Sequence, residues 1–180
     1  MKRKYFQYFL ECLMKAIKKI DNHYTQLSVA CSDKPIYRER VYCYELYHQL
    51  RCILGDDFPY KLYGELDKKS HICYPNEEKP DFVVHIPGKM KQNLVVIEVK
   101  RVLVKDHIKE LRNDFDKLIR FISKTNYYRA IMLIYGNVNG ELPQNIKREI
   151  KCIQDKNIII LWHYKPNEEP KIIGGERYIK

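Results

Sequence analysis

The sequence has little glycine and proline, no internal repeat and no low-complexity tract. Among its 180 residues are only 7 Gly and 8 Pro, while 45% of the residues are hydrophobic. Such a chain is expected to fold rather than to remain disordered. Its length fits one domain, or one domain with a small appendage, and allows a core and a cleft.

Long apolar runs are also absent. No run approaches the length of a membrane span, so we expect no membrane partner. The start, MKRKYFQYFLECLMKAIKKI, is basic, but charges interrupt it too soon for the apolar region of a secretory signal. The six cysteines are scattered without a CxxC pair, which excludes the closely spaced ligand pairs of a zinc site. We therefore expect a reduced, cytoplasmic protein.

Acidic residues are in the minority. The chain has 33 Lys and Arg against 23 Asp and Glu, which gives a formal net charge of +10. This balance favours a polyanionic partner such as nucleic acid or an anionic membrane surface, without choosing between them. A helical apolar stripe over residues 4–20 could lie on such a surface, but packing on the domain is favoured.

Apolar periodicity and turn residues predict the order helix, helix, three strands, helix, strand, helix, strand. The expected helices cover residues 4–20, 32–55, 105–124 and 141–153; the expected strands cover residues 60–66, 80–86, 94–100, 128–136 and 157–164. The second helix should begin near Ser32 or Asp33, with Pro35 in its first turn. Continuous apolar strands predict an α/β fold whose mixed or parallel central sheet is flanked by helices.

The expected domain organisation has three parts. Residues 1–30 form an amphipathic helix packed on the core, residues 31–165 form the main domain, and residues 166–180 form a tail. The tail is assigned because KPNEEPKIIGGERYIK combines turn residues with charge, which is typical of a loosely held terminus.

The segment PDFVVHIPGKMKQNLVVIEVKR, residues 80–101, carries acids on strands that otherwise resemble core. Side chains alternate along a strand, so Val96, Glu98 and Lys100 share one face. If the loop at residues 87–93 closes an antiparallel hairpin, the start of one strand meets the end of the other. Asp81 is then expected to lie beside Glu98 and Lys100.

Two adjacent carboxylates repel each other unless positive charge lies between them. A hard divalent cation such as Mg²⁺ fits, because it takes oxygen ligands and keeps several waters. A lysine on the same face can neutralise a developing oxyanion or orient an attacking water. These parts suit metal-assisted hydrolysis of a phosphodiester. The alternative is a solvated ion pair at a strand edge, which contributes little to stability.

The pattern Pro80-Asp81 followed by Glu98-Val99-Lys100 resembles the PD-(D/E)xK nuclease superfamily, the restriction-endonuclease-like fold, and a bacterial-type member in particular. The resemblance covers residues 35–136. It implies a core of order α-β-β-β-α-β, here with an extra C-terminal helix and strand. It also implies that Asp81 and Glu98 hold Mg²⁺ or Mn²⁺, that Lys100 assists the attacking water, and that the nucleic-acid substrate is DNA.

Many members of the superfamily add a metal-binding glutamate from the first core helix. By resemblance this role falls on Glu45, which lies centrally in CYELYHQLR, with Glu39 as the other candidate. Either residue could instead be a solvated helix glutamate. Glu65, on the first strand, is an auxiliary ligand candidate or a partner of Lys68.

Further basic residues border this segment. His85 shares the face of Asp81 and could act as a general base, although a lone histidine is more often a structural hydrogen-bonder. Lys89 and Lys91 are expected nucleic-acid contacts, because a short basic loop can lie over a phosphate backbone. Arg101 could also contact phosphates, or belong to the solvated start of the next helix.

A second hypothesis keeps the fold without the catalysis. A catalytically inactive module of this fold would bind nucleic acid or a protein partner through its basic surface, and salt-sensitive binding without metal dependence would favour it. A homodimer is compatible with the resemblance, because many nucleases of this kind cut duplexes as dimers.

Overall fold

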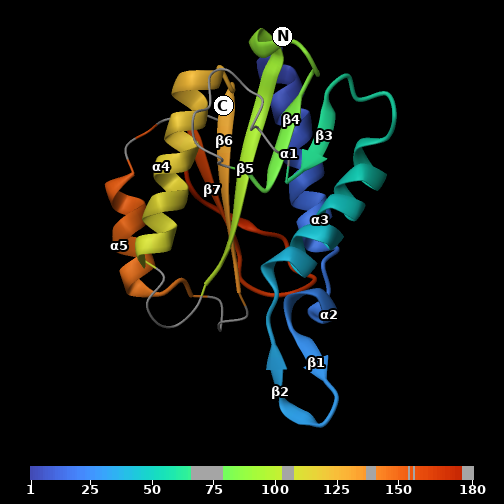
Figure 1. Ribbon diagram of the computed structural model, residues 1–180, viewed down its shortest axis with the longest axis vertical. Coiled ribbons are helices and arrows are strands. Elements are labelled where there is room, and N and C mark those ends of the chain that lie inside the picture. The colour runs from blue at the N-terminus through green and yellow to red at the C-terminus, as the bar shows by residue number, and fades with distance from the viewer. Residues whose placement is uncertain (66–78, 103–107, 137–140, 154, 156, 176–180) are drawn as a thin grey trace.

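The computed structural model describes residues 1–65, 79–102, 108–136, 141–153, 155 and 157–175. The helices are α1 (Lys2–Lys18), α2 (Asn22–Thr25), α3 (Glu39–Leu54), the short 3₁₀ helix η1 (Met90–Gln92), α4 (Ile108–Thr125) and α5 (Gln144–Cys152). The strands are β1 (Leu27–Val29), β2 (Ser32–Ile36), β3 (Lys61–Gly64), β4 (Phe82–His85), β5 (Asn93–Arg101), β6 (Arg129–Tyr135), β7 (Ile158–His163) and β8 (Lys171–Gly174). Figure 1 shows their arrangement.

The central sheet is mixed. Within the described part of the chain it has six strands in the order β3-β4-β5-β6-β7-β8. The pairs β3–β4, β4–β5 and β7–β8 are antiparallel, whereas β5–β6 and β6–β7 are parallel. Parallel neighbours need crossover connections, which α4 and α5 supply. The predicted α/β class, with a mixed sheet flanked by helices, is confirmed.

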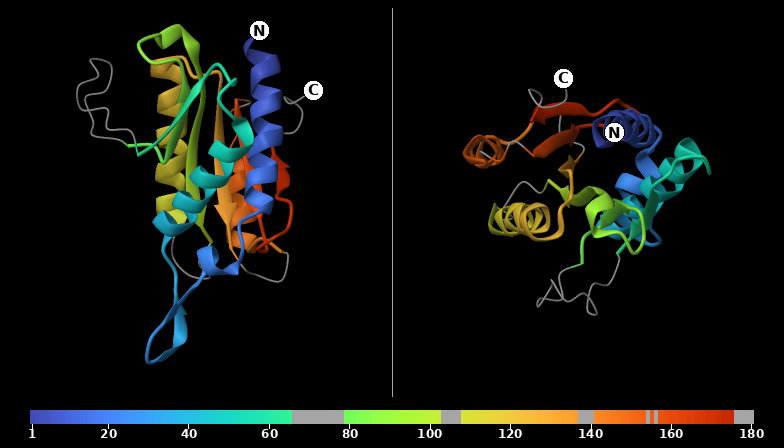
Figure 2. Two further views of the ribbon diagram at one scale, coloured as in Figure 1. Left: turned by 90° about the vertical axis from the view of Figure 1, so that its right-hand side faces the viewer. Right: turned by 90° about the horizontal axis from the view of Figure 1, so that it is seen from above.

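Because side chains alternate along β5, its two faces contribute side chains to two separate cores. Val95, Ile97 and Val99 belong to the core under α1 and α3, whereas Val96 belongs to the core under α4 and α5. Figure 2, in the view from above, shows the sheet between these two helix pairs. Glu98 alternates in step with Val96, so the strand itself directs this carboxylate toward α4.

Helix α1 is part of the first core. Its apolar stripe is buried over Phe6, Phe9, Leu10, Cys12, Leu13, Ala16 and Ile17. The N-terminal stripe therefore packs on the domain, which is the interpretation that the sequence favoured. Among the described residues, no helix is both long enough and apolar enough to cross a membrane.

Strand β5 is longer than its antiparallel neighbour β4. The last register pair between them is Phe82 with Ile97, but β5 continues to Arg101. On the other side β6 accompanies β5 to its end, where Arg101 lies opposite Tyr135. The sheet therefore divides beyond Ile97, and one side of β5 has no strand beside it there in the described part of the chain.

The predicted start of the second long helix is wrong. Ser32–Ile36 form β2, a fully exposed strand paired with β1, and α3 begins only at Glu39. Pro35 lies in this exposed strand instead of a first helical turn. Proline is tolerated at the edge of a sheet, where its missing N–H costs no ladder hydrogen bond. The resulting β1–β2 hairpin projects from the lower end of the molecule in Figure 1.

The C-terminal stretch contributes to the sheet. Lys171–Gly174, within the segment expected to be a tail, form β8 and pair antiparallel with β7. The strand packs closely on β7, because a Cβ atom added at Gly174 would lie 3.0 Å from the Ile160 side chain. Residues 176–180 of the expected tail lie outside the described residues.

Candidate functional site

Beyond Ile97, where β4 no longer pairs with β5, backbone N–H groups of β5 donate hydrogen bonds to carboxylates instead of to a neighbouring strand. The Val99 N–H donates to Asp81 Oδ2 at 2.7 Å, and the Arg101 N–H donates to Glu39 Oε2 at 3.0 Å. Alternate N–H groups of a strand point the same way, so the N–H groups of Val99 and Arg101 lie on the edge of β5 that β4 covers only as far as Ile97. Asp81 before β4 and Glu39 in the first turn of α3 thus meet where the sheet divides.

Glu98 lies beside this point and is nearly inaccessible, with 3% of its surface exposed. Its Oε2 forms an ion pair with Lys117 Nζ on α4, at a distance of 2.6 Å. Its Oε1 is buried and has no hydrogen-bond partner among the described residues. A buried charged oxygen without a partner is costly, so this atom marks a place where a further donor or a cation would be stabilising.

The pKa values of Glu98 and Asp81 are both raised by burial and by nearby negative charge. Burial raises the pKa of Glu98 well above its ordinary value, and the negative charge of Asp81 raises it further against the pull of Lys117. Burial also raises the pKa of Asp81 to about 6, the Val99 hydrogen bond opposes that rise, and Glu39 adds to it. The predicted antiparallel hairpin is confirmed, and it places Asp81 beside Glu98.

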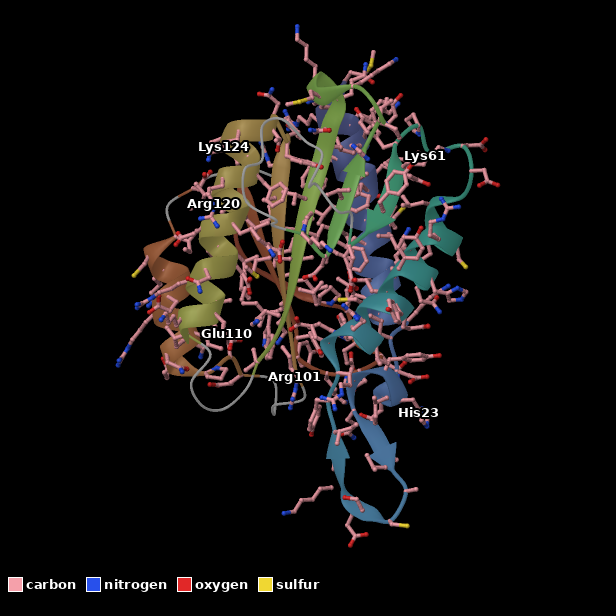
Figure 3. The ribbon with its side chains drawn as sticks, in the orientation of Figure 1. His23, Lys61, Arg101, Glu110, Arg120 and Lys124 are labelled. Atoms are coloured by element: carbon pink, nitrogen blue, oxygen red, sulfur yellow. The ribbon has the colours of Figure 1, made fainter. Side chains whose placement is uncertain are left out.

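Lys100 projects from β5 toward α4, on the same face as Glu98. Its ammonium lies 3.1 Å from Glu110 Oε2 and 3.5 Å from Asp114 Oδ2. Burial lowers the pKa of Lys100, but Asp114, Glu110 and Glu39 outweigh burial and raise the pKa overall. Lys100 therefore stays protonated, which suits it to donate hydrogen bonds rather than to abstract a proton. Figure 3 places Glu110 and Arg101 at this lower end of the molecule.

The two helix glutamates behave differently. Glu39 points to β5, and burial raises its pKa, with Arg101 N–H and Lys100 opposing. Glu45 accepts a hydrogen bond from Gln49 on its own helix at 2.7 Å. The structure brings Glu39 to the site, whereas Glu45, which the resemblance favoured, lies on another face of α3.

Glu65 lies near Asp81 but is turned away from Glu98. The Glu65 N–H donates to the Asp81 carbonyl at 2.9 Å, while its carboxylate pairs with Arg40 at 2.8 Å. Glu65, Asp81 and Cys43 help to line a cavity of about 450 Å³ that opens beside the site. Glu65 thus borders this cavity as part of an exposed ion pair.

His85 and the loop cations lie at the other end of the hairpin. His85 pairs with Lys61 across β3 and meets the Tyr63 ring edge-on at 5.4 Å. Lys89 precedes η1 and Lys91 lies within it, before β5 begins. At about 3.3 Å per residue, the seven steps along β5 from Asn93 to Lys100 span about 23 Å. The structure therefore does not bring His85, Lys89 or Lys91 to the carboxylates.

Arg101, the remaining expected cation, is at the site end of β5. Its guanidinium lies 3.3 Å from the centre of the Tyr37 ring, at the base of the β1–β2 hairpin. Burial lowers the pKa of Arg101, and Tyr135 and Tyr37 oppose this effect. The cation–π contact ties the hairpin base to the end of β5.

Sequence reasoning missed the α4 side of the site. Glu110, Asp114 and Lys117 recur at the four- and three-residue spacing that places side chains on one helix face. That spacing is visible in the sequence, but its meaning depends on which face of α4 packs against Glu98 and Lys100. The ion pairs that Glu110, Asp114 and Lys117 form with these residues supply that information.

The donor set fits a hard divalent cation in part. Asp81 and Glu98 offer carboxylate oxygens, and the buried Oε1 of Glu98 lacks a partner within the described residues. As placed, the described residues contain no group of three or more His, Cys, Asp or Glu side chains that could hold a metal ion. Mg²⁺ is commonly bound through one or two carboxylates plus water, so Asp81 and Glu98 are the residues that would hold it.

Comparison of the chain with protein-family models, with curated proteins and with solved structures finds no match. The chemistry of this cluster is that of buried carboxylates at a division of the sheet, flanked by two lysines.

Proposed function

We propose that this protein is a metal-dependent nuclease that hydrolyses phosphodiester bonds of nucleic acid, with DNA as the expected substrate. The observation that carries the proposal is the adjacent pair of carboxylates, the half-buried Asp81 and the buried Glu98, and Glu98 retains a buried oxygen without a partner among the described residues. Protein interiors do not keep such a pair without compensation, because like charges in a low dielectric repel strongly. A divalent cation would supply the compensation.

The order of elements supports membership of the PD-(D/E)xK superfamily. From α3 to β6 the chain runs α3-β3-β4-β5-α4-β6, and α5 and β7 follow. Asp81 precedes β4, and Glu98 and Lys100 lie on β5. These positions agree with the motif Pro-Asp and Glu-x-Lys to which the sequence bears its resemblance.

Each side chain has a distinct part in the proposed reaction. Asp81 and Glu98 hold the cation, and a bound Mg²⁺ or Mn²⁺ supplies Lewis-acid stabilisation of charge on the phosphate. Lys100, held protonated by Glu110 and Asp114, orients the attacking water or stabilises the developing negative charge. Lys117 neutralises one oxygen of Glu98 and so lowers the repulsion between the two acids.

Cleavage assays with alanine variants test the proposal. Purified protein is incubated with plasmid and with single-stranded DNA in Mg²⁺ or Mn²⁺, and the products are followed on gels. We expect cleavage that EDTA abolishes and that falls roughly hundredfold or more in Asp81→Ala and in Lys100→Ala. Cleavage that survives both substitutions would come from a contaminant or another site, and the assignment would be abandoned.

A matched pair of helix variants tests which glutamate matters. Glu39→Gln should reduce cleavage roughly tenfold, because residues that orient the metal-binding groups typically matter by that factor. Glu45→Gln, the same change on the same helix, should leave cleavage unchanged, because Glu45 is bonded to Gln49. The reverse result would mean that α3 presents its other face to the substrate-bound site.

The second candidate function is an inactive module of this fold that binds nucleic acid or a protein partner. It is favoured by the absence, within the described residues, of a third acid placed to complete a metal site. The ion pair of Glu98 with Lys117 is also compatible with a purely structural role. Salt-sensitive oligonucleotide binding in EDTA, with no cleavage under any divalent metal, would decide for this module.

A further inference from the structure

A cluster of cations lies at the end of the sheet opposite Asp81 and Glu98. Lys2, Lys91 and Arg129 line a cavity of about 530 Å³, together with the amides Asn126 and Asn157. No carboxylate is among the described residues that line it. Three cations therefore line the cavity without a carboxylate among its described lining residues, which favours the entry of an anion.

Arg129 is the cation of this cavity whose position is fixed by several contacts. One of its terminal nitrogens donates to the Tyr128 carbonyl at 2.8 Å and to Asn157 Oδ1 at 3.0 Å. Its guanidinium also lies 4.2 Å from the centre of the Tyr128 ring. Its Nε–H is buried and has no partner among the described residues. These contacts fix the guanidinium in place at the cavity, and a guanidinium held in this way is suited to binding an oxyanion.

The start of α1 adds to the same field. Lys2 begins the helix, and its Nζ donates to the Asn93 carbonyl at 3.1 Å. The first turn contains no acid, and no side chain caps its N–H groups in the described residues. Cations at a helix N-terminus oppose the helix dipole, which favours anions there. Lys2 at this position is accounted for if an anion binds between the helix start and Arg129.

We infer that this far-end cavity, lined by Lys2, Lys91 and Arg129, is a phosphate-binding site. The chemistry recognised is a phosphate oxyanion, either of a free phosphorylated metabolite or of a nucleic-acid backbone. The inference does not depend on the proposed nuclease, since the site lies at the other end of β5. It gives Lys91 a role that its distance from the carboxylates had removed.

The test is an NMR titration of ¹⁵N-labelled protein with inorganic phosphate at constant ionic strength. We expect saturable shifts of the amide signals of Asn126, Tyr128 and Arg129. The double variant Lys2→Ala/Lys91→Ala should weaken binding about two- to fivefold for each cation removed, which is the range for partly exposed ion pairs. The control Lys61→Ala removes an exposed lysine on β3, outside the cavity, and should leave binding unchanged.

Two outcomes overturn the inference: shifts that never saturate, or equal weakening in Lys61→Ala. Titrations with AMP and with a short oligothymidylate then separate the two sources of phosphate. Tighter binding of the oligonucleotide, lost in the double variant, indicates a backbone contact. Equal or tighter binding of AMP indicates a phosphorylated metabolite. Both results support a phosphate site, and neither requires DNA cleavage.

Discussion

At the residue scale, Glu98 poses the main energetic question. A carboxylate with 3% exposure is accommodated by one short ion pair to Lys117, whose ammonium also donates to the Lys79 carbonyl at 3.1 Å. Removing one partner of a buried ion pair leaves an uncompensated charge and is strongly destabilising. Lys117 is therefore expected to matter for stability as well as for the site.

The variant Lys117→Met tests this role. We expect the free energy of unfolding to fall by about 3 kcal/mol in EDTA, because Glu98 then loses its counter-charge. The double variant Lys117→Met/Glu98→Met should recover most of that loss, since an apolar pair of similar volume replaces the ion pair. Urea denaturation followed by circular dichroism measures both changes.

Lys124→Met is the matched control for Lys117→Met, because Lys124 is an exposed lysine on the same helix. Its effect should stay within about 0.5 kcal/mol, as for most surface substitutions. If the Lys117 and Lys124 variants lose the same stability, the ion pair with Glu98 is not significant in solution.

The pKa of Asp81 gives a pH prediction with a definite sign. Its folded value of about 6 lies above the ordinary 3.8. Between these values the folded protein keeps a proton that the unfolded chain has lost, so stability falls as the pH rises from about 4 to 6. The expected loss from Asp81 is on the order of 3 kcal/mol.

Asp81→Asn should flatten this part of the pH profile, because asparagine can still accept the Val99 hydrogen bond without a charge. Urea titrations in EDTA at several pH values between 4 and 7 provide the measurement. Asp33→Asn, on the exposed strand β2, is the control and should keep the wild-type slope. An unchanged slope in Asp81→Asn would contradict the burial of this carboxylate.

At the element scale, the sequence predicted what local patterns control. The strands around Val83, Val96 and Ile131 are continuous apolar runs, and the Pro87-Gly88 turn indicated that the first two form an antiparallel hairpin. The start of α3 was not predictable in this way. Pro35 is compatible both with a first helical turn and with an exposed edge strand, and pairing with β1 decides between them.

The contacts of α4 were also beyond local reasoning. Its amphipathic pattern predicts a buried face with Leu111, Phe115 and Leu118. The pattern does not predict that Lys117 reaches Glu98, because this depends on how α4 is placed across the sheet. For the same reason Glu45 and Glu39 could not be ranked from their positions in the helix.

The β1–β2 hairpin is expected to be dispensable for folding. All five β2 residues are exposed, and β1 supplies only one half-buried residue, Leu27. An isolated two-stranded hairpin contributes little stability by itself. Replacing residues 27–36 with a short glycine-serine linker should change the free energy of unfolding by less than about 1 kcal/mol.

Truncation of α1 is the contrasting control for the hairpin. Removing residues 2–18 eliminates side chains that are wholly buried, among them Phe9, Leu13 and Ile17. Circular dichroism should therefore show a folded hairpin-replaced protein and an unfolded α1-truncated protein. A large loss of stability on hairpin replacement would mean that β1 and β2 pack on the domain in solution.

At the scale of the whole molecule, the net charge of +10 is unevenly distributed between the two ends of the sheet. Asp81, Glu98 and Glu39 gather where the sheet divides, whereas Lys91 and Arg129 lie at the other end of β5 and β6. Figure 3 also places Arg120 and Lys124 toward that upper end. Composition predicted a polyanionic partner, but it could not predict that a further group of cations would lie at the end of the sheet opposite the proposed catalytic acids.

This separation makes a prediction about nucleic acid that needs no catalysis. If the backbone enters the acidic site, the charge on Asp81 repels it whenever no cation is bound. Asp81→Asn should then tighten oligonucleotide binding in EDTA by about two- to fivefold, the size of one partly screened charge interaction. Fluorescence anisotropy at low salt measures the affinity.

Glu11→Gln, an exposed acid on α1, removes the same unit of charge away from the site and serves as the control. If it tightens binding as much as Asp81→Asn, the gain comes from net charge alone, and nucleic acid does not pass the carboxylates. A gain confined to Asp81→Asn, and abolished when Mg²⁺ is added, is the result that the nuclease proposal requires. The cation then neutralises in the wild type the charge that the substitution removes.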